Sequence, residues 1–346
     1  MTVSVIIQGF GAMGREILAA LAARTDADVI AVLDTDATLV GRRLGEVVGT
    51  SRWPDVVVRH PDEVRLGDLR ADVAVHATTA FVDVAVPQIA ALLDAGADVV
   101  TLCQELVYPR EENADLAADL HRTAVAAGRT VVAGGVNPGW ILDLLPIAAS
   151  LGCRDIDAVR ATRVVDFSPY GPDEMVHIGA GLDEDRFRAG ADSGEIGHIG
   201  LLESARMVAD ALGLDVDRWE QTKDPVISPD GHATPFADVA PGHVRGFRQR
   251  VRGWTGDRLR ADFEMVGLID VRADDPELGD RIAITATPDI AVTVQGGDTT
   301  DGGTSTAGVV TNLIGPALAS GPGLRTIADL PLTRSRTTLR LPASVS

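Results

Sequence analysis

The sequence predicts an α/β protein in which a Rossmann-like, doubly wound parallel sheet is joined to an α+β second domain with a mainly antiparallel sheet. Over residues 1–138, short apolar runs alternate with helical patterns, as in a parallel sheet that helices cover on both faces. A glycine-rich turn directly follows the first of these runs. From about residue 155 onward, apolar residues instead occupy every second position, which is typical of strands with one covered face.

The composition limits the kinds of partner. The chain has 346 residues, of which 45% are hydrophobic and 23% charged, enough for two globular domains. Its net charge of −19 argues against a nucleic-acid or anionic-membrane partner, because phosphate groups are bound by basic surfaces. No apolar run is long enough for a membrane span, and the first residues lack a signal-peptide pattern. The two cysteines, Cys103 and Cys153, are too few for a disulfide framework and lack the spacing of a zinc site, so we expect no metal site. Two free thiols are typical of a reducing compartment, and we expect a cytoplasmic protein.

The glycine turn predicts a dinucleotide site. A β-branched run over residues 3–8 leads into Gly9-Phe-Gly-Ala-Met-Gly14 and then into a helical pattern. Glycines at 9, 11 and 14 allow a tight turn, close approach of the backbone to a pyrophosphate, and close packing of helix on strand. The amides of Ala12 and Met13, at the start of the helix, would then face the phosphates. The alternative is a turn of the same fold that binds nothing.

The end of the second strand bears on the choice of cofactor. This strand, residues 29–33, ends at Asp34, where an acid would hold the hydroxyls of the adenosine ribose. Asp34 and Asp36 would repel a 2′-phosphate, which favours NAD. Arg42 and Arg43 could bind that phosphate if their loop folds back, although solvated surface arginines are the simpler interpretation. Both NAD and NADP therefore stay open.

A further strand pattern, residues 71–79, carries His76, Thr78 and Thr79 at its carboxyl end, near the expected path of the cofactor. Hydroxyl groups and backbone amides there would contact the ribose or the pyrophosphate. For His76, a role as acid–base catalyst is a minor alternative to that of a hydrogen-bonded loop histidine.

Glu105 is the candidate chemical centre. The apolar run at residues 98–100 predicts a buried parallel strand, and Pro109 prevents strand pairing from continuing. A carboxylate just past the carboxyl end of such a strand lies where open α/β sheets bind their ligands. We interpret Glu105 as the catalytic residue of a nicotinamide-dependent enzyme.

A second loop is expected beside the nicotinamide ring. It follows the strand pattern at residues 129–133 and reads Gly134-Gly-Val-Asn-Pro-Gly-Trp140. The two glycines let the backbone approach a ligand, Asn137 can hydrogen-bond a carboxamide, and Pro138 restricts the turn. An ordinary turn before a helix is the alternative.

The second half of the chain predicts a sheet and one long helix. Alternating strand patterns cover residues 158–165, 244–254, 258–265, 282–287 and 290–295. Residues 197–212 form an amphipathic pattern whose inward face consists of Ile199, Leu202, Ala205, Val208 and Leu212. Residues 166–194 look rich in loops, and Tyr170 is expected there in a substrate pocket or a dimer contact.

The last part of the chain is expected to return to the first domain. Thr304 or Ser305 is a candidate cap for an apolar helix over residues 307–318, and Thr304 or Thr306 could instead face the substrate. We expect a dinucleotide-binding domain over residues 1–138, a substrate and dimerisation domain over 139–302, and a returning segment over 303–346.

Taken together, these motifs resemble the 2,4-diaminopentanoate dehydrogenase and native amine dehydrogenase family, whose nucleotide domain is similar to that of dihydrodipicolinate reductase. The resemblance covers nearly the whole chain. It rests on Gly9-Phe-Gly-Ala-Met-Gly14, Asp34 with Val40-Gly41 and Leu44-Gly45-Glu46, Glu105 with Tyr108-Pro109, Gly135-Val-Asn-Pro-Gly139, Gly197-His-Ile-Gly-Leu-Leu-Glu203 and Pro322-Gly-Leu-Arg-Thr-Ile-Ala-Asp-Leu-Pro331.

The resemblance implies NAD(P)-dependent interconversion of an amine with an aldehyde or ketone plus ammonia, in a homodimer whose second-domain sheets pair. It implies that Glu105 is catalytic and that Trp140 occupies a pocket position that is typically aromatic. One departure is Gln104, which stands where the family often has a second acid, and it weakens the expectation of a diamine substrate. The paired histidines and lysine of dihydrodipicolinate reductase are missing from the comparable region, which argues against that activity.

Four other functions stay open. The chain could be a 2,4-diaminopentanoate dehydrogenase, or another imine or carbonyl reductase of the same fold. An amino-acid dehydrogenase is less favoured, because no arginine is obviously placed to hold a carboxylate. From a different class, a sensor that binds NAD(P) without turnover is the remaining alternative, against which the Glu105 loop argues.

Overall fold

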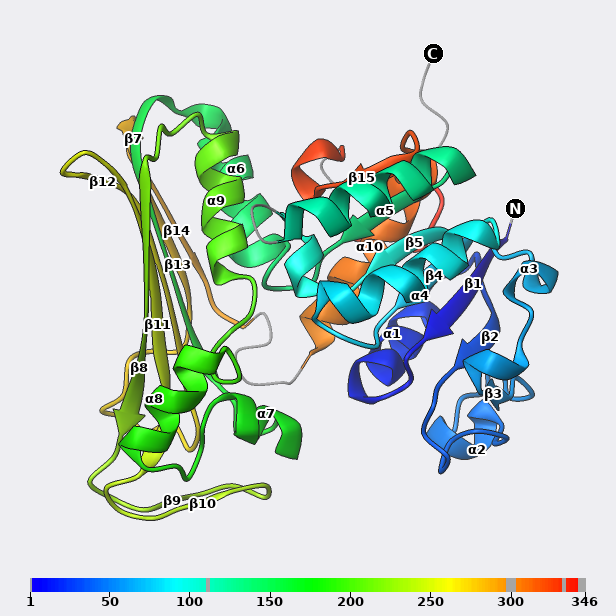
Figure 1. The fold of residues 1–346 in the computed structure, drawn as a ribbon, viewed down its shortest axis with the longest axis horizontal. Helices are drawn as coiled ribbons and strands as arrows, with labels where there is room; N and C mark the ends of the chain where they lie inside the picture. The colour runs from blue at the N-terminus through cyan, green and yellow to red at the C-terminus, as the bar shows by residue number, and fades with distance from the viewer. Residues whose placement is uncertain (1, 110–112, 297–302, 332–333, 342–346) are drawn as a thin grey trace. The chain divides into compact units, whose positions relative to one another are not determined.

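The computed structural model describes residues 2–109, 113–296, 303–331 and 334–341. The chain forms two compact units (Figure 1): unit 1 consists of Met1–Gly135 with Ser305–Ser346, and unit 2 of Val136–Thr304. The boundaries lie a few residues from the expected ones, and the expected boundary at Gly302 falls outside the described residues. The predicted fold class is confirmed, since unit 1 contains a parallel sheet with helices and unit 2 a second sheet.

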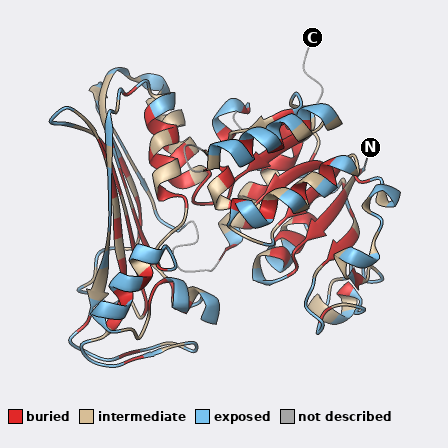
Figure 2. Cartoon of the chain, viewed as in Figure 1, coloured by how far each residue is buried: buried red, intermediate tan, exposed pale blue. Residues whose placement is uncertain are grey.

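Unit 1 is built on a sheet whose seven described strands run parallel in the order β15-β6-β5-β4-β1-β2-β3. The strands are β1 (Val3–Gln8), β2 (Ala27–Leu33), β3 (Val58–Arg59), β4 (Val73–His76), β5 (Asp98–Thr101), β6 (Thr130–Ala133) and β15 (Gly323–Arg325). Every residue of β4, β5 and β6 is buried, which explains their unbroken apolar runs (Figure 2). The strand order reverses between β1 and β4, and loops at such a reversal form the ligand crevice of doubly wound sheets.

The helices of unit 1 are α1 (Ala12–Ala22), α2 (Leu44–Val48), α3 (Leu66–Leu69), α4 (Val82–Asp94), α5 (Ala114–Ala127) and α10 (Thr304–Ala319), with short 3₁₀ turns η1 (Pro61–Glu63), η2 (Gln104–Leu106) and η6 (Ile327–Asp329). Strand β15, near the end of the chain, pairs with β6 and forms an edge of the sheet of unit 1. Helix α10 begins at Thr304, and Thr304 and Ser305 therefore lie within its first turn instead of capping it.

Unit 2 contains a mixed sheet whose described strands have the order β14-β13-β7-β12-β11-β8. The strands are β7 (Arg154–Asp166), β8 (Arg218–Ile227), β11 (Val244–Thr255), β12 (Arg258–Leu268), β13 (Gly279–Thr287) and β14 (Ile290–Val294). The pair β12–β7 is parallel and the other pairs are antiparallel. The sequence patterns did not predict β8, because this edge strand is mostly exposed, largely polar and interrupted by Pro225.

One face of this sheet is covered by helix α9 (Leu201–Ala211), which packs on β11 and β12 (Figure 1). The helix is shorter than predicted, and its buried face is rotated: Leu201, Ser204, Ala205, Met207, Val208 and Ala209 are buried, whereas Leu202 is only partly so. The segment expected to be rich in loops contains α7 (Pro172–His177) and α8 (Glu184–Ser193).

The other elements of unit 2 are a π-helix η4 (Trp140–Leu144), α6 (Leu145–Ala149), η5 (Ser150–Gly152), and the short strands β9 (His232–Ala233) and β10 (Asp238–Val239). Among the described residues, no helix is both long and apolar enough to cross a membrane.

Candidate functional site

The glycine turn after β1 lies at the reversal of strand order. Gly9 adopts a φ of +92°, and a Cβ atom there would come within 2.4 Å of the main-chain oxygen of Ala77, in the loop after β4. A Cβ on Gly14 would lie 2.2 Å from the main-chain oxygen of Gly9, so helix α1 packs directly on the turn. A Cβ on Gly11 would meet nothing within 4 Å, which leaves its outer side open to a ligand.

The start of helix α1 can receive an anion. Gly11 is its N-cap residue, no side chain caps the helix, and its first turn carries no acidic residue. The backbone N–H groups around Ala12 and Met13 are therefore unpaired donors at the positive end of the helix dipole. Helix N-termini of this kind bind phosphate groups in other proteins. This arrangement fits the pyrophosphate of a dinucleotide.

Asp34 is hydrogen-bonded to the same turn. Its Oδ2 atom accepts a hydrogen bond from the backbone N–H of Phe10, and its Oδ1 atom accepts one of 2.8 Å from that of Asp36. The carboxylate thus lies against the glycine turn, as a residue that binds ribose hydroxyls must. Arg42 donates to the main-chain oxygen of Glu46 at 3.3 Å, and Arg43 pairs with Asp55.

His76 lies in a buried hydrogen-bond network, and its assignment as a cofactor contact stays a prediction. The residue is fully buried. Its Nδ1 atom lies 2.9 Å from Oγ1 of Thr101, and its Nε2 atom lies 2.8 Å from Oε1 of Gln88 and 2.9 Å from Oγ1 of Thr78. Burial lowers the pKa of His76, so the ring is neutral. Both ring nitrogens already have hydrogen-bond partners. The Thr78 hydroxyl belongs to this network, since it donates to Gln88 at 2.6 Å.

Glu105 lies in η2, just after β5, and its carboxylate is held at the N-terminus of α4. Its Oε2 atom accepts a 2.7 Å hydrogen bond from the backbone N–H of Val82, the first residue of that helix. Nearby, Oγ1 of Thr79 accepts from the N–H of Phe81 at 3.1 Å, and the main-chain oxygen of Ala80 accepts from the N–H of Glu105 at 3.3 Å. The loops after β4 and β5 are therefore joined at the carboxyl edge of the sheet.

Cys103, two residues before Glu105, is buried and its thiol donates to the main-chain oxygen of Ala80 at 3.2 Å. Burial raises the pKa of the Cys103 thiol to about 12. The thiol is therefore protonated and unreactive at neutral pH.

The loop with Asn137 and Pro138 belongs to unit 2 and is tightly held. The N–H of Ile141 donates to the main-chain oxygen of Val136 at 2.8 Å, and the N–H of Gly139 donates to Oδ2 of the fully buried Asp143. Burial raises the pKa of Asp143 to about 6. Asn137 is only 7% exposed, and its Oδ1 atom has no hydrogen-bond partner among the described residues. A buried acceptor without a partner fits the amide group of a nicotinamide.

The sequence patterns did not assign a role to His198, Gly200 or Gln249, although all three lie at this loop or directly behind it. Nε2 of His198 is 3.2 Å from both Nδ2 and the main-chain oxygen of Asn137. A Cβ on Gly200 would lie 2.6 Å from Cγ of Pro138. Gln249, on β11, hydrogen-bonds the backbone of His198. The only sequence signal was the short Gly-His-Ile-Gly motif, which was predicted to begin the helix over residues 197–212 and which lies directly before α9 in the structure.

The predicted pocket residues occur in both units. Trp140 begins the π-helix and packs, partly buried, against the core of unit 2. Tyr170 packs on Phe167 in the same core, with ring centroids 5.0 Å apart. Thr306 lies in the first turn of α10 in unit 1. Their assignment to a pocket stays a prediction.

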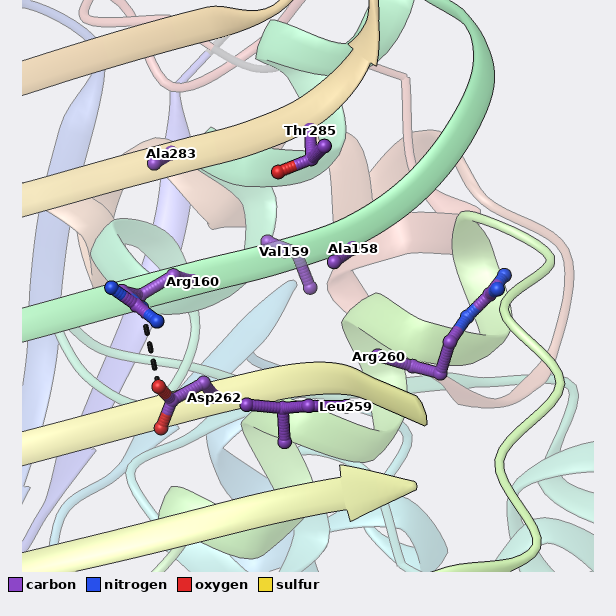
Figure 3. A pocket seen from close by; sticks show the side chains of 8 residues that line it. All are labelled: Ala158, Val159, Arg160, Leu259, Arg260, Asp262, Ala283 and Thr285. Atoms are coloured by element: carbon purple, nitrogen blue, oxygen red, sulfur yellow. Dashed lines mark ion pairs between the residues drawn. The ribbon is translucent and has the colours of Figure 1, made fainter. Parts of the chain in front are cut away.

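A separate hollow of about 240 Å³ lies on the face of the unit 2 sheet opposite α9 (Figure 3). Its lining includes Ala158, Leu259 and Ala283, together with Arg160 and Asp262, which pair at 3.2 Å. No residue that the sequence predicted for the site lines this hollow. Among the described residues, no three histidine, cysteine or acidic side chains are grouped so that they could hold a metal ion.

Comparison with known proteins relates the chain to amine-converting enzymes. Residues 140–340 match the family model of the 2,4-diaminopentanoate dehydrogenase C-terminal domain. The chain is 28% identical over 337 residues to 2,4-diaminopentanoate dehydrogenase of Acetoanaerobium sticklandii, an alignment that covers 96% of this chain and 94% of that protein. It is 27% identical over 354 residues to an amine dehydrogenase of Streptomyces virginiae, covering 95% and 96% of the two chains. The solved amine dehydrogenase of Mycobacterium smegmatis shares the fold, with a TM-score of 0.82, 23% identity and 98% of each chain covered.

Proposed function

The chain belongs to the family that the 2,4-diaminopentanoate dehydrogenase C-terminal domain defines, and from this membership we propose that it is an NAD(P)-dependent amine dehydrogenase. It would catalyse the reductive amination of an aldehyde or ketone with ammonia, and the reverse oxidative deamination. The observation that carries this proposal is the Glu105 carboxylate, held by the N–H of Val82 at the same sheet edge as the glycine turn.

The chain's own groups fit a nicotinamide dinucleotide. The glycine turn and the uncapped start of α1 would hold the pyrophosphate, and Asp34 would hold the adenosine ribose. Asn137, with its buried and unpartnered Oδ1 atom, would accept a hydrogen bond from the carboxamide. Both NAD and NADP stay possible, because Asp34 opposes a 2′-phosphate whereas Arg42 lies exposed in a neighbouring loop.

Glu105 provides the proton transfers that amination requires. Ammonia adds to the carbonyl carbon, and the carboxylate takes a proton from the new ammonium group. The same carboxyl group gives this proton to the alkoxide oxygen, which forms the carbinolamine hydroxyl. A second proton, taken up from solvent by Glu105, is then given to this hydroxyl, which leaves as water, and the restored carboxylate faces the positive iminium. A nicotinamide cofactor, when bound, would supply the hydride for this iminium and would accept it in the reverse direction. In that direction, Glu105 deprotonates the ammonium form of the substrate.

The substrate is best described as a small carbonyl compound or amine. Gln104 replaces the second acid that the resembling family often carries, so this chain lacks a carboxylate there for a second ammonium group. This favours a monoamine over a 2,4-diamine. Trp140 and Tyr170, together with Thr306, would shape the pocket.

The assembly and location are also proposals. We propose a cytoplasmic homodimer that pairs through the open face of the unit 2 sheet. On that face, the side chain of Asp262 is only 5% exposed beneath Arg160 and Arg250. A small apolar cluster of Val164, Val266 and Leu268 lies on the same face. Arginine is enriched in protein interfaces, and the centre of an interface is more apolar than the rest of the surface.

The proposal is tested by NADH and NADPH oxidation with a panel of aldehydes and cyclic ketones, with and without a high ammonium concentration. Ammonia-dependent oxidation is expected, with the preferred cofactor and carbonyl compound identified in the same experiment. Oxidation independent of ammonia would indicate a carbonyl reductase. Cofactor binding without oxidation in either condition, and without oxidation of diamines by NAD⁺ or NADP⁺ in the reverse direction, would indicate a sensor.

A further inference from the structure

We propose that residues 196–200 form a clamp that fixes Asn137 and Pro138, and that His198 is a positioning residue for the nicotinamide half of the cofactor. This inference rests on the proposed function, in which Asn137 binds the carboxamide. The clamp consists of Ile196-Gly-His-Ile-Gly200, directly before helix α9. All of its contacts described below lie within unit 2.

The first contact joins His198 to Asn137. The Nε2 atom of His198 lies 3.2 Å from Nδ2 of Asn137 and 3.2 Å from its main-chain oxygen. Burial, with further contributions from the positive charges of Arg163 and Lys223, lowers the pKa of His198 to about 4, so the ring is neutral. Either neutral form holds Asn137: an unprotonated Nε2 accepts from the side-chain amide, and a protonated Nε2 donates to the main-chain oxygen.

The second contact joins Gly200 to Pro138. Gly200 has a φ of +93°, which favours glycine, and a Cβ at this position would lie 2.6 Å from Cγ and 3.1 Å from Cδ of Pro138. Real Cβ atoms do not approach a ring this closely, so the absence of a side chain at Gly200 lets the clamp lie directly on the proline.

The sheet holds the clamp from behind. Gln249 on β11 accepts from the N–H of His198 at 2.7 Å and donates to its main-chain oxygen at 3.0 Å. Nζ of Lys223 on β8 donates to the main-chain oxygen of Ile196 at 2.9 Å. A Cβ on Gly197 would meet Oε1 of Gln249 at 2.8 Å and Cδ of Lys223 at 2.9 Å. The clamp is therefore rigid because two strands bind its backbone.

This arrangement leaves one end of the Asn137 side chain for a ligand. The Nδ2 end faces His198, whereas Oδ1 is buried and has no partner among the described residues. A buried acceptor held in one orientation complements the N–H₂ group of a carboxamide, and it loses little conformational entropy on binding. The clamp thus acts on the nicotinamide ring and makes no contribution to binding of the adenosine diphosphate half.

The test compares two ligands that differ only in the nicotinamide. The dissociation constants of the reduced cofactor and of the matching ADP-ribose, with a 2′-phosphate if NADPH is preferred, are measured by calorimetry on the full chain. The variants are His198→Leu, which removes the polar ring, His198→Gln, which keeps a donor and an acceptor, and Gly200→Ala, which inserts a methyl group against Pro138. His243→Leu is the control, since His243 contacts the main-chain oxygen of Pro241 instead of the clamp.

We expect His198→Leu and Gly200→Ala to weaken binding of the reduced cofactor about tenfold, the effect of one lost hydrogen bond, and to leave ADP-ribose binding within about twofold. His198→Gln should recover most of the loss, and His243→Leu should change neither constant. An unchanged ratio of the two constants in both His198→Leu and Gly200→Ala, or an equal loss for both ligands, would overturn the clamp.

The outcome for the unaltered chain separates the two proposals. If it binds neither NADH nor NADPH, the proposed function fails and the clamp fails with it. If it binds and oxidises the cofactor but the variants keep the ratio unchanged, only the clamp fails. Should His198→Leu not fold, Gly200→Ala provides the same comparison with the ring intact.

Discussion

Glu105 accepts a 2.7 Å hydrogen bond through its Oε2 atom from the backbone N–H of Val82, the first residue of helix α4. The carboxylate therefore has two possible effects. It satisfies a helix N-terminus, where a negative charge is stabilised by the helix dipole, and its other oxygen can exchange a proton with a substrate. A substitution that keeps the hydrogen bond but removes the charge distinguishes these effects.

Glu105→Gln should abolish nearly all turnover while preserving the fold. The amide oxygen can still accept from Val82, so the melting temperature and the cofactor dissociation constant should change little, whereas kcat should fall about 10²- to 10⁴-fold because the general base is lost. Steady-state kinetics and calorimetry measure both. Asp83→Asn is the matched control, since it removes a negative charge from the exposed side of the same first helical turn and should leave kcat nearly unchanged. Near-normal turnover in Glu105→Gln would refute its catalytic role.

Asp34→Asn should shift cofactor preference towards NADPH. Asparagine keeps one acceptor oxygen, which can still accept from the N–H of Phe10 at the glycine turn, although the second bond, from the N–H of Asp36, is lost. The negative charge that repels a 2′-phosphate is gone. We expect the ratio of the NADPH to the NADH dissociation constant to fall about tenfold, equivalent to about 1.4 kcal/mol. Fluorescence titration with both cofactors measures this ratio. An unchanged ratio of the two dissociation constants would indicate that the 2′-position of the adenosine ribose lies away from Asp34.

Asp143 should make the stability of unit 2 depend on pH. Burial raises its pKa from 3.8 to about 6, so between these values the folded chain binds a proton that the unfolded chain has released. Stability from this group is therefore present below pH 4 and is lost as pH rises to 6, by about 3 kcal/mol in total. Asp143→Asn removes this dependence.

The measurement is the free energy of unfolding in urea for both proteins from pH 4 to pH 7. The difference, unaltered chain minus Asp143→Asn, should decrease between pH 4 and pH 6 and then level off towards pH 7. Asp192→Asn, at an exposed position on α8, is the control for the effect that replacing an aspartate by asparagine has on stability at a solvent-exposed position. A difference that stays constant with pH would mean that Asp143 has an ordinary pKa.

Ala283→Arg should disrupt the proposed dimer. Ala283 is exposed on β13 and lines the hollow on the open face of the unit 2 sheet, so a long charged side chain there would obstruct a second sheet (Figure 3). Light scattering after size-exclusion chromatography should show a monomer, or a dimer dissociation constant raised at least about tenfold. Ala118→Arg, on the exposed side of α5, should leave the assembly unchanged. A stable dimer in Ala283→Arg would show that the dimer interface lies on another surface of the chain.

Much of unit 1 could be predicted because its signals are local. Glycine spacing predicts a turn since only glycine lacks the Cβ that would clash at Gly9 and Gly14. Strands buried on both faces produce apolar runs that no other element of that length produces. The same reasoning failed for β8, because an exposed edge strand has no buried face to impose a pattern. It predicted α9 and the burial of Ala205 and Val208, but not the whole buried face, which is set by the sheet beneath the helix.

Local patterns of residues predict the fold class, the dinucleotide turn and the candidate carboxylate at Glu105, because each depends on residues close together in the chain. Which candidates keep a free polar group depends on the packing of distant segments. This packing buries His76 among Thr101, Gln88 and Thr78, and so uses both ring nitrogens. It also brings His198 onto Asn137, 61 residues earlier in the chain. Such long-range contacts depend on how helices and strands pack, and no local pattern of residue types encodes them.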